Sequence, residues 1–303
     1  MISQRSILQV AILLVAVSST AEAQLTVLSA GDTSAQWTSA QLSLIDQQLL
    51  DQTIKGALRN ELESQKVWLN QWNSGQLKAG PWIKQRENTQ RMLEPTLDPE
   101  KSASALREKL LGKKAKPTTA DTQALQKLLE QNPGDLGLQQ LYLHWIDQKH
   151  YRDEFADKIV STASTLANEL AKVEKQTDDL RHARAYCYYR AARALTHLES
   201  REMQAKQPIK DLAQHEAQLL GFYNQLGELV GHDRPEFILL EIRMLRRDHW
   251  NGQALMLLEE HAEILETNWY LQHRRDLLND LGWNPPAKEA ETIAANAAAE
   301  KVR

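Results

Sequence analysis

The stretch between residues 179 and 203 constrains the fold more than any other part of the sequence. Its apolar residues recur at steps of three and four, which places them on one narrow face of an α-helix. These residues are Leu180, Ala183, Cys187, Ala191, Ala194 and Leu198. Most of them are small, so a second helix can approach that face closely. Tyr186, Tyr188, Tyr189 and Leu195 point in other directions. A helix that is apolar on several sides is usually packed between neighbours, and we expect 179–203 to be an inner helix.

The rest of the chain follows the same helical pattern. Glycine and proline are sparse, with 12 and 9 in 303 residues, and most fall between segments of helical periodicity. Good helix formers dominate those segments, and no run of alternating β-branched residues follows the N-terminal 23 residues. Short connections favour antiparallel neighbours. The sequence therefore predicts an all-α protein of stacked antiparallel helices, arranged as an irregular α-solenoid-like array.

Helix signals and breakers divide the chain into regions. Thr38 is the expected N-cap of a long helix that runs to Ser74, with an interruption near Gly56. Asp98 followed by Pro99 is the expected start of another helix. The basic stretch 113–119 reads as a solvated linker. We expect an N-terminal helical region over 24–112, a helical-pair array over 120–284 and an Ala- and Glu-rich tail over 285–303 with little to bury.

The first 23 residues predict export. Arg5 is followed by an apolar run from Ile7 to Val17 and then by Ala21-Glu22-Ala23, the pattern of a signal peptide with cleavage before Gln24. The apolar run is too short for an ordinary membrane span, and no later segment approaches ~20 apolar residues. We expect a mature chain without a transmembrane segment, in the periplasm or outside the cell. An uncleaved N-terminal anchor is the alternative.

Charge and cysteine content limit the possible partners and cross-links. The formal net charge of -4 gives no reason to expect a nucleic-acid partner. Cys187 is the only cysteine, so no disulfide can form within one chain. Because Cys187 lies on the apolar stripe, we expect a buried, inert thiol.

No common catalytic or metal-binding motif appears. His215-Glu216 lacks the second histidine of a zinc-protease motif, and Asp147 with His150, or Glu259 with His261, is an isolated pair that we expect on a solvated helix face. Gly112-Lys113 lacks the upstream glycine of a phosphate-binding loop. We therefore predict no cofactor and no metal.

Two short stretches resemble a known repeat family. Asn132-Pro133-Gly134-Asp135, with Leu141, Trp145, Tyr151 and Ala156 after it, resembles a degenerate tetratricopeptide unit. Arg247-Asp248-His249-Trp250, followed by Ala254, resembles the same corner of another unit. The resemblance implies an α-solenoid of irregular helix pairs that binds a partner through a concave face.

A candidate partner surface lies near the C-terminal end. It consists of Trp250, Trp269, Trp283, Arg243, Arg246 and Arg247, because aromatic and arginine side chains are enriched at interaction surfaces. Alternatively, the tryptophans fill gaps between helices and the arginines belong to a solvated face. We predict a non-enzymatic exported protein that binds another protein in the cell envelope or outside the cell. The alternative is an α/α-toroid enzyme acting on polysaccharide, with a groove lined by tryptophans and carboxylates.

Overall fold

The structure is a computed structural model. It describes residues 34–77, 94–99, 103–111, 118–148, 155–204, 206, 208 and 211–302. The predicted signal peptide, 1–23, lies outside the described residues.

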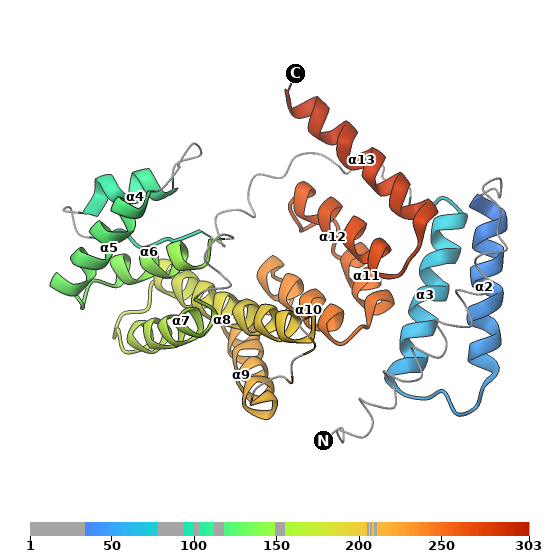
Figure 1. The fold of residues 1–303 in the computed structure, drawn as a ribbon, viewed down its shortest axis with the longest axis horizontal. Coiled ribbons are helices and arrows are strands. Elements are labelled where there is room, and N and C mark those ends of the chain that lie inside the picture. Colours follow the sequence, from blue (N-terminus) through green and yellow to red (C-terminus); the bar gives the residue numbers. More distant parts are fainter. Residues whose placement is uncertain are drawn as a thin grey trace. The chain divides into compact units, whose positions relative to one another are not determined.

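The predicted all-α class is confirmed, because the described residues form helices and no strand (Figure 1). The helices are α2 (Ser34–Leu50), α3 (Ala57–Asn73), α4 (Ser104–Leu111), α5 (Thr119–Gln131), α6 (Leu136–Ile146), α7 (Ala156–Ala171), α8 (Asp178–Gln204), α9 (Leu212–Val230), α10 (Pro235–Arg247), α11 (Asn251–Glu260), α12 (Thr267–Asp280) and α13 (Asn284–Val302).

The chain forms two compact units, one up to Lys78 and the other from Ala79 onward. This division lies upstream of the predicted linker at 113–119, most of which falls outside the described residues. The first unit contains α2 and α3, and the second contains α4 to α13. The predicted N-terminal region, 24–112, would contain α2, α3 and α4 together. In the structure, α2 and α3 belong to the first unit and α4 belongs to the second.

The first unit is a hairpin of α2 and α3 rather than one long helix. The Asp51 carboxylate accepts hydrogen bonds from the N–H and the hydroxyl of Thr53, both at 2.8 Å, and Gly56 adopts a φ of 61°. Such a local side-chain bond competes with helical hydrogen bonding, and glycine enters the left-handed region without strain. The predicted N-cap Thr38 is wrong: α2 begins at Ser34, and the Thr38 hydroxyl donates to the Ser34 carbonyl oxygen at 2.7 Å.

In the second unit, residues 94–99 form a non-helical segment docked on α6. The Leu97 N–H donates to the side-chain oxygen of the fully buried Gln140 at 2.8 Å. A Cβ atom at Gly137 would lie 2.5 Å from the Asp98 carbonyl oxygen, so only glycine permits this approach. The predicted helix start at Asp98 is therefore wrong, because Asp98 and Pro99 belong to the docked segment and α4 begins at Ser104.

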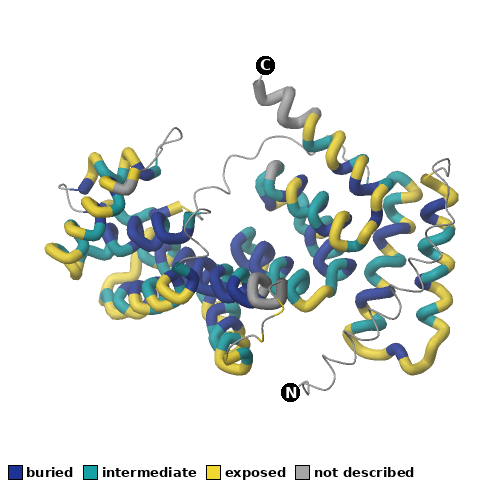
Figure 2. The backbone as a smooth tube through the Cα atoms, in the orientation of Figure 1, coloured by how far each residue is buried: buried dark blue, intermediate teal, exposed yellow. Residues whose placement is uncertain are grey.

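Helix α8 is the inner helix that the sequence predicted. Its side chains from Ala185 to Ala192 are all buried, and Cys187 is fully enclosed; the buried stretch is dark blue in Figure 2. It contacts α7, α9 and α10. Thr196, on the other side of this helix from Ala191 and Ala194 by helical phase, is also buried at 2% exposed, and its hydroxyl donates to the Arg193 carbonyl oxygen at 2.9 Å.

Each helix from α5 to α13 contacts the next helix along the chain, and α8 also contacts α10. The solenoid arrangement stays a prediction. The C-terminal region differs from the predicted tail: Asn284 opens α13, which packs on α12 and buries Ala287 and Ala290. Proline is tolerated in a first helical turn, so Pro285 and Pro286 stand at the start of this helix.

Candidate functional site

A cleft of about 460 Å³ lies in the second unit among α8, α10, α11 and α12, which appear from yellow to red in Figure 1. Among the described residues, its lining combines cationic, imidazole, amide and hydroxyl side chains with one carboxylate and one isoleucine. The lining residues are Thr196, Ile242, Arg243, Arg246, Arg247, His249, Asn251, His273 and Asp280. The three predicted arginines therefore share one cleft.

Helix α10 places these arginines together by its periodicity. Arg243, Arg246 and Arg247 are spaced at i, i+3 and i+4, so they lie on one face. The N-terminal half of α10 is buried through Phe237 and residues 238–240. Proline occupies the first helical position, where its missing N–H costs nothing. Burial of this half anchors α10, and its C-terminal half presents the arginines.

Ion pairs hold two of the arginines in place. Arg246 donates from Nε and Nη2 to Oδ2 of Asp280, at 2.9 and 2.5 Å. Arg247 donates to the buried Glu199 of α8 at 3.3 Å and to Asp248 at 2.7 Å. Burial raises the pKa of Glu199 above its ordinary value, although Arg247 opposes that shift. The guanidinium groups are thus oriented before any ligand arrives.

His273 supplies a neutral polar group beside the arginines. Burial, together with the positive charges of Arg243 and Arg246, lowers its pKa to about 4. Its Nδ1 atom is buried and makes no hydrogen bond within the described part of the chain. A neutral imidazole has one donor and one acceptor nitrogen, so His273 can offer either to a ligand. The cleft thus combines guanidinium groups held by ion pairs with a neutral imidazole.

The three predicted tryptophans do not share one position. Trp250 lies between the lining residues His249 and Asn251 in sequence and is partly exposed, as is Trp269. Trp283 is only 4% exposed, so its place in the predicted surface is wrong and it belongs to the core. Trp68 and Trp145 are buried too, which supports the gap-filling alternative for these rings. Helical phase alone did not separate the buried rings from the exposed ones.

The sequence missed an ion network between α6 and α8. Asp147 accepts hydrogen bonds from Arg190, at 2.6 Å, and from Arg193. The Arg190 guanidinium also lies 4.7 Å from the centre of the Tyr186 ring, and the Tyr186 hydroxyl is 3.0 Å from Nδ1 of His144. The expected solvated position of Asp147 is therefore wrong. The sequence did contain a signal for this network, because Arg190 and Arg193 are basic residues on an otherwise apolar helix.

A second missed network joins α11 to α12. The Glu259 carboxylate accepts from the Tyr270 hydroxyl at 2.5 Å and from Arg274 Nε at 2.8 Å. Arg274 and Tyr270 are both 1% exposed, so Glu259 does not lie on the solvated face expected for it. Because charge-assisted bonds of this kind need both partners, the network fixes the register of α12, which carries His273 and Asp280 into the cleft.

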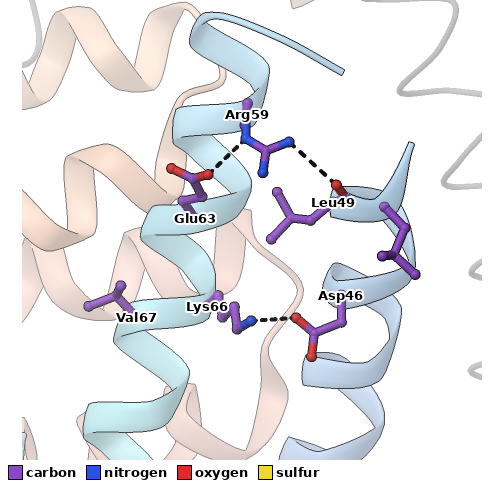
Figure 3. Close-up of a pocket in the computed structure, with 7 residues that line it drawn as sticks. Asp46, Leu49, Arg59, Glu63, Lys66 and Val67 are labelled. Carbon is purple, nitrogen blue, oxygen red and sulfur yellow. Dashed lines mark hydrogen bonds and ion pairs between the residues drawn. The ribbon is translucent and has the colours of Figure 1, made fainter. Parts of the chain in front are cut away.

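The first unit has a cavity of about 610 Å³ between α2 and α3 (Figure 3). Lys66 of α3 pairs with Asp46 of α2 at 2.6 Å, and Arg59 pairs with Glu63 at 2.9 Å. Leu50 is 80% exposed at its rim. The charged side chains here are mutually paired and about half exposed, so they are weak candidates for holding a ligand.

Comparisons with protein families, curated proteins and solved structures find no match. In the part of the chain that the structure describes, no helix is long and apolar enough to cross a membrane. Within those same residues, no cluster of three or more His, Cys, Asp or Glu side chains is arranged to hold a metal ion. The cleft among α8, α10, α11 and α12 is therefore the principal candidate site.

Proposed function

We propose that the protein is an exported, non-enzymatic binding protein that docks a partner protein of the cell envelope or the extracellular space. Docking uses the second unit and its cleft among α8, α10, α11 and α12. The observation that carries this proposal is the convergence of side chains from four helices on one open cleft of about 460 Å³. A cleft assembled from several rigid helices can hold a partner segment in one orientation.

The chemistry of the lining favours binding over catalysis. Arginine is enriched at interaction surfaces and is always charged, which suits recognition but not proton transfer. The polysaccharide-hydrolase alternative needs a pair of carboxylates across a groove. Among the residues that the structure describes, Asp280 is the one carboxylate that lines this cleft, and it is paired with Arg246. The described residues thus give that alternative no specific support.

A steric block of the cleft tests the proposal. The purified protein is immobilised and used to capture partners from a cell-envelope extract, and the captured protein is then purified and titrated against it directly. Asn251→Trp places a bulky ring in the cleft without altering its charge, since Asn251 lines it at the first position of α11. Arg275→Gln is the control, because Arg275 pairs with its neighbour Asp276 at 2.7 Å and does not line the cleft.

We expect Asn251→Trp to weaken the direct titration at least tenfold, while Arg275→Gln changes it less than twofold. If the purified partner binds Asn251→Trp and the wild type equally, the partner docks elsewhere and the proposed site is wrong. If no captured protein binds saturably in the direct titration, the proposed function is wrong.

A further inference from the structure

We infer that α6 carries a binding site for an extended peptide, and that residues 94–99 fill this site from within the same chain. The site consists of Gly137 and Gln140, and we call it the α6 site. Its ligand is an extended segment of a partner protein with the pattern Pro-x-Leu-x-Pro, which competes with the chain's own copy at 95–99. The α6 site is separate from the cleft proposed above, so either can stand without the other.

The α6 site contacts the main chain of its occupant. A Cβ atom at Gly137 would lie 2.5 Å from the Asp98 carbonyl oxygen and from the Pro99 nitrogen, so the backbone of the segment lies directly against the helix. The Leu97 N–H donates to the side-chain oxygen of Gln140 at 2.8 Å, and Gln140 is fully buried. Such main-chain contacts suit any extended segment that lacks proline at the position of Leu97.

Two prolines prepare the segment for this site. Pro95 and Pro99 are both buried, and Leu97 between them is partly buried. Proline fixes its own φ and disfavours the helical conformation of the residue before it. The segment is therefore extended before it docks, and docking costs it little conformational entropy. Because both prolines are buried, they also define which extended segments the site accepts.

The other polar contacts of the segment, among the described residues, are long or exposed. The Thr96 hydroxyl donates to the Asp179 carbonyl oxygen at 3.3 Å in an exposed position. Arg107 donates to the Pro95 carbonyl oxygen at 3.3 Å and lies 3.5 Å from the Asp98 carboxylate, which is 86% exposed. Exposed ion pairs contribute little to stability. The segment thus rests mainly on one buried hydrogen bond and two prolines, which a partner segment can supply in the same way.

The amide group of Gln140 has a further hydrogen bond to offer. Its Nε2 atom is buried and makes no hydrogen bond to any residue that the structure describes. The occupant already contacts Oε1 of the same amide group, so a chain that lies in this position passes next to Nε2. A buried donor without an acceptor is unfavourable. A partner segment that places a carbonyl oxygen there gains a bond that the internal segment does not make.

A peptide with the sequence of residues 93–100 tests the inference. It is labelled with fluorescein and titrated by anisotropy against the purified full chain. In the wild type the tethered segment competes at a high effective concentration, so the peptide should bind weakly. Leu97→Pro removes the N–H that reaches Gln140 and should bind the peptide at least tenfold more tightly than the wild type.

A second variant opens the α6 site in another way. Pro95→Gly combined with Pro99→Gly keeps the Leu97 N–H, but it raises the entropy that the internal segment loses on docking. This double variant should bind the peptide severalfold more tightly than the wild type. A misfolded chain cannot produce tighter and saturable binding in both variants.

Changes in the peptide and in α6 check where the peptide binds. A peptide with proline in place of its leucine at position 97 lacks the same N–H and should bind the Leu97→Pro chain at least tenfold more weakly. Adding Gly137→Ala to that chain should weaken the original peptide by a similar factor, because the new Cβ takes the place of the backbone. Gly134→Ala is the matched control, since a Cβ there meets nothing within 4 Å, and it should change binding less than twofold.

Circular dichroism separates loss of the site from loss of the fold. The inference is overturned if a variant that opens the site keeps its helical spectrum but binds the peptide no more tightly than the wild type, or if Gly137→Ala and Gly134→Ala have equal effects. Unfolding of both opening variants overturns it too, because residues 94–99 are then part of the core and not an exchangeable ligand. None of these outcomes bears on the cleft, which Asn251→Trp tests separately.

Discussion

Ala191 illustrates how a single small side chain holds the fold together. It is fully buried on α8, beside the equally buried Ala192 and one turn from Cys187. Burial raises the pKa of the Cys187 thiol far above its ordinary value, so the thiol stays protonated and inert, as its place on the apolar stripe predicted. Close helix packing at this point leaves no room for added methylene groups.

Enlarging that side chain should therefore destabilise the protein. We expect Ala191→Leu to lower the free energy of unfolding by ~1–3 kcal/mol, the usual cost of overpacking, measured by thermal and urea melts followed by circular dichroism. Thr165→Leu is the matched control on the exposed side of α7 and should change stability by less than ~0.5 kcal/mol. A loss below ~0.5 kcal/mol in Ala191→Leu, as small as in the control, would contradict the orientation of α8 described above.

Two histidines with small exposure give the protein a defined response to acid. Burial lowers the pKa of His144 and of His273 to about 4, from 6.5, and the nearby Arg190 and Arg243 add to those respective shifts. The unfolded chain binds protons first, so stability falls as the pH drops from about 6.5 to 4 and levels off below that. One pKa unit corresponds to about 1.4 kcal/mol, so each histidine costs up to about 3 kcal/mol.

Substitution isolates this effect from carboxylate titration. Urea melts at several pH values should show a shallower loss of stability in His144→Gln and in His273→Gln than in the wild type. His261→Gln, which leaves His144 and His273 in place, is the control variant, and the change of its stability with pH should follow that of the wild type. An unchanged slope in both of the first two variants would show that these histidines are not buried in their neutral form.

At the scale of elements, Gly137 fixes how the segment 94–99 meets α6. The backbone of Asp98 and Pro99 occupies the space that a side chain at Gly137 would need. Alanine usually stabilises a helix by up to ~1 kcal/mol relative to glycine. The clash reverses that sign, and we expect Gly137→Ala to destabilise the protein by ~1–3 kcal/mol in urea melts.

Gly134 provides the matched control, because a Cβ atom there meets nothing within 4 Å. Gly134→Ala should be neutral or slightly stabilising. A Gly137→Ala variant as stable as Gly134→Ala would mean that the segment 94–99 does not dock on α6 as described.

Sequence periodicity predicted the type of each element better than its ends. The inner position of α8 followed from its apolar residues on several sides, and Cys187 was placed correctly. Thr38 and Asp98 both look like helix caps in the sequence. In the structure, Thr38 lies inside α2 and Asp98 lies in the non-helical segment 94–99. Asp98 is held by Gly137, about forty residues away in sequence, and no local pattern carries that information.

The candidate site was predictable only in part. The i, i+3, i+4 spacing of Arg243, Arg246 and Arg247 placed them on one face, and the structure brings all three to one cleft. His273 and Asp280 come from α12, so their arrival at the same cleft depends on how α10 and α12 pack. The buried place of Trp283 follows from the same tertiary contacts, which a single helix does not encode.

At the scale of the whole molecule, the division after Lys78 predicts which fragment folds alone. The fragment 79–303 keeps the bond between Leu97 and Gln140 and the ion pair between Lys109 and Asp121 at 2.6 Å. It should therefore melt cooperatively with a helical spectrum. The fragment 120–303, which starts after the predicted linker, loses both contacts and exposes the fully buried Gln140, so its melting temperature should be clearly lower. Equal melting of the two fragments would favour the boundary at 113–119.

Hydrogen–deuterium exchange with the purified partner tests the central claim, that the cleft of the second unit is the docking site. The backbone N–H groups of residues 243–251 and 267–280 flank that cleft and should exchange more slowly once the partner is bound. The change should disappear in Asn251→Trp, while α2 and α3 remain unaffected. Protection confined to α2 and α3, with no change in α10, α11 or α12, would contradict this account.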